Sequence, residues 1–301
     1  MSTFNKYLTS ISSTIGLLAI ANLVSIDSAQ AFSANFTNGS FESSFSTGWT
    51  TTGGGDSSIQ GGNVQGIAPT SGSNHALITN AYQSRNDDSP TGIGTFNKSG
   101  TNPISASIEQ SGNLQEFLGL SDNSLSIARQ NGQISGLRTP KEGSGFKQTF
   151  DVTEGGNATI DFSWNFLSND GGNTILGDRD FAFFTFYNEN DLVASRTVIP
   201  LSHSTGTVPT LASNSTNFAN AGSYSNYSLN AGNLATGRYV LGFGVVDADG
   251  SDRSSGLLVD NVRVQAVPFE FSPSFGLVIV AGIFGCDRLR RQIKARSEIK
   301  F

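Results

Sequence analysis

Alternation of apolar and polar residues marks a strand in the middle of the chain. In the stretch ATIDFSWNF at 158–166, Ile160, Phe162, Trp164 and Phe166 alternate with polar residues. Side chains of a β-strand point alternately to its two faces, so one face here is apolar and the other polar. The pattern predicts an antiparallel strand with one buried face.

Three further stretches are typical of strands. Residues 180–187 (DFAFFTFY) are apolar on both sides, as in the central strand of a sandwich. Residues 238–246 (RYVLGFGVV) and 257–264 (LLVDNVRV) add two more strands. The polar run NEND at 188–191 supplies a turn between strands.

The rest of the middle region contains no convincing long helix. Residues 114–120 form one short helix at best, and the polar stretches 80–145 and 202–232 are interpreted as long loops. The pattern as a whole predicts an all-β fold, an antiparallel β-sandwich with long loops.

The composition agrees with short strands joined by many turns. The chain has 35 glycines and 22 phenylalanines, and only 14% of its residues are charged. Its net charge of −6 argues against a nucleic-acid partner, which needs clustered lysines and arginines. The single cysteine, Cys286, leaves 32–267 without disulfides, so this region must be stabilised by packing, hydrogen bonds or a bound metal.

The first 31 residues have the layout of a secretory signal peptide. Lys6 lies in a short polar start, an apolar run follows at 15–24, and Ala29 and Ala31 are the small residues of a cleavage site. We therefore expect export, with Phe32 as the first mature residue.

The other end of the chain has an apolar segment followed by positive charge. Residues 275–286 (FGLVIVAGIFGC) are uncharged, and a basic tail follows at 288–296. A helix over 269–286 would be about 27 Å long, close to the roughly 30 Å of a bilayer's hydrocarbon core. We expect a short transmembrane helix at about 274–286, with the basic tail in the cytoplasm and the region before it outside.

This end resembles a bacterial sorting signal. Val267-Pro268-Phe269-Glu270, the apolar segment and the arginines together resemble the PEP-CTERM signal, with Pro268-Phe269-Glu270 in place of the usual Pro-Glu-Pro. The resemblance implies an exosortase-type sorting enzyme and secretion machinery as partners, membrane anchoring before processing, and a final place at the cell surface or outside the cell. The expected organisation is a signal peptide at 1–31, a β-sandwich domain at 32–267 and a sorting segment at 268–301.

Asp260 interrupts an apolar pattern. Alternation within 257–264 places it on one face with Leu258, Val262 and Val264. A buried carboxylate without a partner costs several kcal/mol. The carboxyl group therefore needs a partner or must stay protonated, and either a bound cation or a set of backbone N–H donors would stabilise its charged form.

Two segments resemble the opening and the end of galactose-binding-like jelly rolls, a group with many carbohydrate-binding modules. They are NGSFE at 38–42, followed by Gly48-Trp49-Thr50, and Asp260-Asn261-Val262. The resemblance implies adjacent first and last strands, and a structural Ca²⁺ bound by Glu42, Asp260 and Asn38. The other interpretation leaves Glu42 in solvent and lets Asp260 accept backbone hydrogen bonds from the first loop. Both interpretations stay open at this point.

Three tyrosines are candidates for ligand contact. Tyr82, Tyr224 and Tyr227 fall in predicted loops, and loops on a rigid scaffold carry many binding residues. Trp49 and Trp164 are interpreted as structural, because Trp164 lies on an apolar strand face and Trp49 in a turn that closes the sandwich.

The sequence shows no catalytic constellation. Residues 32–267 contain no cysteine and no Gly-x-Ser-x-Gly motif, and His75 and His203 lack metal-ligand spacing. We expect no enzyme. The first hypothesis is an exported, exosortase-sorted surface or extracellular-matrix protein whose sandwich binds carbohydrate, with calcium as a structural ion. The alternatives are a structural or adhesive surface protein without a specific small ligand, and a polysaccharide-active hydrolase.

Overall fold

The computed structural model describes the middle of the chain. The described residues are 32–52, 57–80, 104–105, 112–122, 124–125, 142–168, 180–203, 212–213, 219–220, 222–247, 255–267, 288 and 290–291. Contacts divide the chain into two units, Met1–Ala29 with Val267–Phe301, and Gln30–Ala266. Almost all described residues belong to the second unit, and the fold below is that of this unit.

Several sequence-based expectations lie outside the described residues. These are the cleavage residues Ala29 and Ala31, the sorting motif Pro268, Phe269 and Glu270, the membrane segment at about 274–286, and Tyr82. Among the residues described, no helix is long and apolar enough to cross a membrane.

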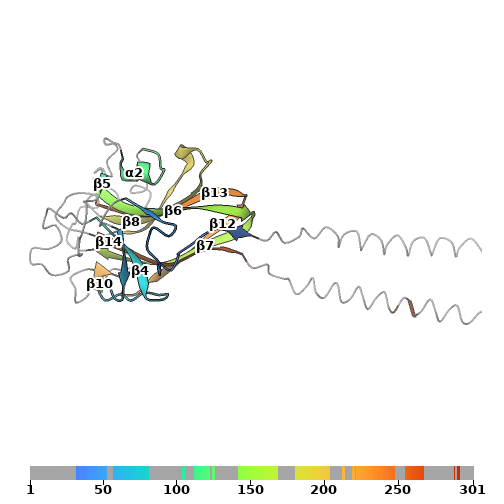
Figure 1. The fold of residues 1–301 in the computed structure, drawn as a ribbon, viewed down its shortest axis with the longest axis horizontal. Helices are drawn as coiled ribbons and strands as arrows, with labels where there is room; N and C mark the ends of the chain where they lie inside the picture. The colour runs from blue at the N-terminus through green and yellow to red at the C-terminus, as the bar shows by residue number, and fades with distance from the viewer. Residues whose placement is uncertain are drawn as a thin grey trace, which may run out of the picture. The chain divides into compact units, whose positions relative to one another are not determined.

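Two antiparallel sheets lie face to face (Figure 1). The first sheet has the strand order β1-β6-β13-β8-β9, and the short strands β2 and β5 also pair with β6. Its strands are β1 (Ser33–Ala34), β2 (Thr50–Thr51), β5 (Ile104–Ser105), β6 (Glu142–Glu154), β8 (Phe181–Asn188), β9 (Val198–His203) and β13 (Gly237–Asp247).

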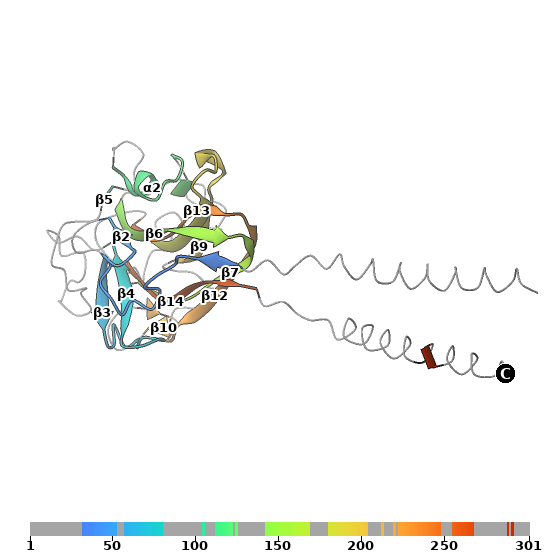
Figure 2. The ribbon, with the colours of Figure 1, turned by 45° about the vertical axis from the view of Figure 1, so that its right-hand side comes forward.

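The second sheet has the order β10-β11-β7-β14-β4-β3, and β12 also pairs with β7. Figure 2 shows β4, β14 and β12 in one layer, with β6 and β13 in the other. The strands of this sheet are β3 (Ser57–Gly61), β4 (Asn74–Thr79), β7 (Gly156–Ser168), β10 (Ala212–Ser213), β11 (Ala219–Asn220), β12 (Ser225–Leu234) and β14 (Ser255–Ala266).

Aromatic rings fill the space between the sheets. Phe162 of β7 meets Phe184 of β8 and Phe243 of β13 edge to face, with ring centroids 5.1 and 5.0 Å apart. Trp164 and Trp49 are both buried in this core. The structural interpretation of the two tryptophans is therefore confirmed. Many of the described phenylalanines are buried in the same core.

A short helix covers the outer face of the first sheet. Helix α2 (Leu114–Phe117) begins at Asn113, whose side chain accepts a hydrogen bond from the backbone N–H of Glu116. Leu114 packs with Phe181 of β8 in a second apolar cluster. The expectation of one short helix within 114–120 is confirmed at 114–117.

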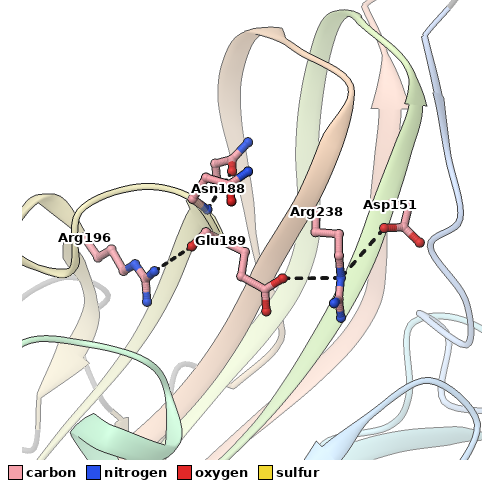
Figure 3. Close-up of polar contacts among 6 residues, drawn as sticks. Asp151, Asn188, Glu189, Arg196 and Arg238 are labelled. Carbon is pink, nitrogen blue, oxygen red and sulfur yellow. Dashed lines mark hydrogen bonds and ion pairs between the residues drawn. The ribbon is translucent and has the colours of Figure 1, made fainter.

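A polar network lies at one rim of the first sheet, where β8 turns through the 3₁₀ helix η2 (Val193–Ser195) to β9 (Figure 3). Arg238 Nε lies 3.3 Å from Glu189 Oε2 and 3.9 Å from Asp151 Oδ1. Arg196 Nη2 donates to the carbonyl of Glu189 at 2.8 Å. The three side chains that form the ion pairs are exposed, so these pairs contribute at most about 1 kcal/mol each.

The sequence-based fold class is confirmed as two antiparallel β-sheets. The four predicted strands correspond to β7, β8, β13 and β14. The interpretation of 202–232 as a loop is wrong over 225–232, because these residues form most of β12 on the edge of β7. The interpretation of 80–145 as a loop is wrong at its end, where β6 begins.

The predicted face of Asp260 needs a correction. Asp260 is fully buried, as expected, but on the outer face of the second sheet. A β-bulge between Asp260 and Arg263, with Asn261 at a φ of 54°, reverses the alternation. Val262 and Val264 therefore pack in the inner core, on the face opposite to Asp260.

The chain's opening and closing strands meet only in part. Strand β1 pairs with β6 in the first sheet, and β14 lies between β7 and β4 in the second. The segment after β1 reaches the bulge of β14, where Val262 N–H donates to the carbonyl of Gly39 at 2.8 Å. The opening segment is thus bonded to the closing strand, although β1 itself is not.

Candidate functional site

Asp260 anchors a loop that covers the outer face of the second sheet. Its Oδ2 accepts hydrogen bonds from Thr70 N at 2.6 Å, Thr70 Oγ1 at 2.8 Å and Ser71 N at 2.9 Å. Its Oδ1 accepts from the backbone N–H of Asn261 at 2.6 Å. Hydrogen bonds to a carboxylate are among the strongest that a protein forms, so this set offsets the cost of burying the charge.

Glu42 anchors the other end of the same loop. Its Oε1 accepts from the backbone N–H groups of Ser73 and Asn74, both at 2.9 Å. Gly72 lies between the two anchor points with a φ of +67°, and a Cβ there would lie 2.4 Å from Glu42 Oε1. Glycine is therefore required at this turn.

The hydrogen bonds of this loop bear on the two interpretations of the acidic pair. The loop amides around Asp260 match the interpretation without a metal. Glu42 is exposed, as that interpretation expects, but it also accepts hydrogen bonds from the loop. Among the described residues, no group of three or more His, Cys, Asp or Glu side chains could hold a metal ion. Bound calcium therefore stays a prediction of the resemblance alone.

Asn38 stabilises the opening segment from within. Its Oδ1 accepts from Ser43 N at 3.0 Å, and its Nδ2 donates to the carbonyls of Ser43 and Ser44. Asn38 has a φ of 49°, a conformation that asparagine tolerates better than most residues. The structure thus gives this third metal candidate a role in a turn.

A hydrogen-bonded histidine–tyrosine pair lies beside Asp260. Tyr224 Oη and His75 Nδ1 are 2.7 Å apart, and His75 is fully buried. Burial raises the pKa of the Tyr224 hydroxyl, and the negative charge of Asp260 raises it further, so the phenol keeps its proton. Burial lowers the pKa of His75, and Asp260 opposes this with a smaller effect. Both groups are therefore neutral near pH 7.

We expect the burial of His75 to make stability depend on pH. Because the folded protein holds the His75 pKa below its ordinary value of 6.5, the unfolded chain binds the proton more readily. Stability is then complete above about pH 6.5 and falls as the pH drops toward the lowered folded pKa, by at most about 1.4 kcal/mol per pH unit. His75→Asn keeps an acceptor near Nδ1 but does not titrate. Urea denaturation between about pH 7.5 and pH 5 should show a smaller loss for this variant, and equal losses would contradict the assignment.

Beyond this covered region, the outer face of the second sheet opens into a polar groove. Strand β7 contributes Asp161 and Ser163 to the lining, and its neighbour β12 contributes Asn226 and Ser228. Ser163 pairs with Asn226 across the two strands, and Ser163 Oγ donates to Asn226 Oδ1 at 2.9 Å. Antiparallel pairing therefore places these polar side chains in rows on one surface.

Strand β14 forms the other side of the groove. It contributes Arg263 and Gln265 from the strand and Asn261 from the bulge. The groove has a volume of about 340 Å³, at the lower end of the range for small-molecule sites. Its polar lining combines amides, hydroxyls, a carboxylate and a guanidinium, a set that offers both donors and acceptors to a ligand.

The structure places the three tyrosine candidates differently. Tyr224 lies just before β12 and binds His75. Tyr227 lies within β12 and is among the residues that line the groove, while its ring stacks on Phe162 in the core at 5.3 Å. Tyr82 lies outside the described residues.

Sequence reasoning missed the groove itself. Its residues come from strands far apart in the chain, since Ser163 and Asn226 are separated by 63 positions. The alternation in 158–166 identified the polar face of β7 but not its neighbours. A β-strand assignment for 225–234 would have been the signal needed to place Asn226 and Ser228 beside it.

Comparisons with known proteins give little guidance. No family model matches the chain, and no curated protein matches it. Among solved structures, the chain is similar to the enzymatically active domain of tailspike protein 4 from bacteriophage CBA120, at 13% identity and a TM-score of 0.34. The match covers 77% of this chain and 21% of the tailspike chain. A similarity of this size does not establish a shared fold or activity.

Proposed function

We propose that the β-sandwich is a carbohydrate-binding module of an exported surface protein, and that the polar groove of β7, β12 and β14 is its binding site. The observation that carries the proposal is the groove itself, a volume of about 340 Å³ on the outer sheet face, and most of the residues that line it are polar. Such a surface suits a polar, uncharged or weakly charged ligand better than an apolar one.

The chemistry of the lining matches sugar hydroxyls. A hydroxyl both donates and accepts, and the amides of Asn226, Asn261 and Gln265 each present one donor group and one acceptor group. Arg263 adds donors and Asp161 adds an acceptor. Neighbouring groups of opposite character can bind two adjacent hydroxyls of one sugar ring at the same time.

The kind of β-sandwich is also part of this proposal. We infer a jelly roll of the galactose-binding-like kind, and the bond between Gly39 and Val262 supports it, because it joins the opening segment to the closing strand. The burial of Trp49 beside that segment supports it too. The pairing of β1 with the other sheet is a departure from the simplest form of that pattern.

The proposed location rests on the two ends of the sequence. A signal peptide at 1–31 and a PEP-CTERM-like segment at 268–301 would deliver the sandwich to the cell surface or the extracellular matrix. Polysaccharides of that compartment are then the available ligands. Cell fractionation, with mass spectrometry of the mature termini, tests the location separately from the binding.

A glycan array followed by affinity electrophoresis tests the binding. We expect the wild-type chain to bind at least one polysaccharide, and Asn226→Ala to bind it about tenfold more weakly because one hydrogen-bonding side chain is lost. Asn190→Ala, on the exposed turn after β8, is the matched control and should bind like the wild type. Absence of binding to every glycan, or equal binding by Asn226→Ala, would contradict the proposal.

A further inference from the structure

We propose that the groove recognises an acidic sugar, a uronate, and that Arg263 binds the sugar's carboxylate. This inference rests on the proposed function and names its ligand class. Arg263 is an exposed residue of β14, and its side chain lines the groove.

Arg263 lacks the partner that its position offers. It lies directly opposite Asp161 of β7 in the register, where opposite charges normally attract. Asp161 Oδ2 instead accepts from Thr159 Oγ1 at 3.0 Å and from Gln265 Nε2 at 2.9 Å. Over the described part of the chain, Arg263 forms no ion pair with Asp161 and no side-chain hydrogen bond. Its guanidinium therefore keeps its donors for a ligand.

The guanidinium fits a carboxylate better than it fits a hydroxyl. It is planar and presents parallel N–H groups that bind both oxygens of a carboxylate at once. Among the described residues that line this groove, Arg263 is the only cationic one. A single carboxylate on the ligand would balance its charge, whereas a doubly charged group would also meet the negative charge of Asp161.

The groups around Arg263 supply the remaining contacts of a uronate. Asp161 can accept from a ring hydroxyl through the oxygen that Thr159 and Gln265 do not use. Asn226 and Asn261 provide amides at the same groove. A carboxylate beside adjacent hydroxyls, which is the pattern of a uronic acid, therefore matches the donors and acceptors present.

The overall charge makes this contact specific. With a net charge of −6, the chain repels an anionic polymer at long range. Binding of an acidic polysaccharide then requires a local contact such as Arg263, because the long-range electrostatic interaction between chain and polymer is repulsive. A preference for an acidic over a neutral polymer would thus report on the groove itself.

A matched pair of polymers tests the inference. The probes are polygalacturonate and the same polymer with its carboxyls methyl-esterified, measured by affinity electrophoresis with a metal chelator present to prevent gelling. We expect the wild-type chain to bind the free acid at least about tenfold more tightly, and Arg263→Gln to lose most of this preference. Arg238→Gln, which changes an exposed arginine of the first sheet, should keep the preference. Thermal melting of each variant confirms that it is folded.

The outcomes separate this inference from the proposed function. Equal binding of both polymers by the wild type overturns the inference while the binding function stands. A preference that survives in Arg263→Gln overturns the role of Arg263. Polyglucuronate serves as a second acidic probe. If the chain binds neutral glycans on the array but neither polygalacturonate nor polyglucuronate, the inference is overturned while the binding function stands. Binding of no glycan at all removes both.

Discussion

Replacing Asp260 with asparagine is expected to destabilise the fold by about 3 kcal/mol, because the variant places an amide where three donors converge on one oxygen. The introduced amide would leave either its own NH₂ group or the donors of Thr70 and Ser71 without an acceptor in a buried site. For a unit of this size, such a loss lowers Tm by roughly 6–12 °C. Thermal melting and urea denaturation measure the change.

Two controls define what the Asp260 result means. Asp151→Asn removes an exposed carboxylate that lies 3.9 Å from Arg238, and should change stability by less than about 1 kcal/mol. Excess chelator should leave the wild-type Tm unchanged if hydrogen bonds from the loop, without a cation, stabilise the Asp260 carboxylate. A chelator-dependent drop as large as that of Asp260→Asn would instead point to calcium, and an unchanged Tm for the variant would contradict the anchoring role.

The second large effect is expected at Gly39. A Cβ at this position would lie 1.9 Å from the carbonyl oxygen of Val262. Because this oxygen belongs to the backbone, it cannot move aside without distorting β14. Gly39→Ala should therefore cost about 3 kcal/mol and break the bond between Gly39 and Val262. Urea denaturation measures the loss.

Gly61→Ala is the matched control for Gly39. Its Cβ would meet only the side-chain oxygen of Asn74, at 3.1 Å, and this side chain can rotate away. We expect a change of less than about 1 kcal/mol. Similar losses for the two alanine variants would mean that the opening segment is not held closely against β14.

The sequence could predict the parts of the fold that follow local alternation. Strand β7 shows a clear apolar face, and β8 is apolar on both faces, so both read as strands without any knowledge of their partners. The burial of Asp260 was also predictable, because an acid within an apolar run needs an explanation. The groups that surround Asp260 could not be predicted, because its partner Thr70 lies 190 residues earlier in the chain.

Two features escaped prediction for physical reasons. The bulge at Asn261 reverses which residues of β14 face the core, and a single extra residue leaves no mark on composition. Strand β12 lies at an edge and alternates between half-buried and exposed residues, so its sequence resembles a polar loop. The groove depends on both features, since β12 forms one side and the bulged β14 the other.

The outer face of the second sheet is the surface that we propose binds carbohydrate. Hydrogen–deuterium exchange with and without a bound polysaccharide reports on this surface strand by strand. We expect slower exchange in 226–228 of β12 and 261–265 of β14 when the polysaccharide is present. Slower exchange confined to the first sheet or its turn at 189–196, with the groove strands unchanged, would show that the ligand binds elsewhere.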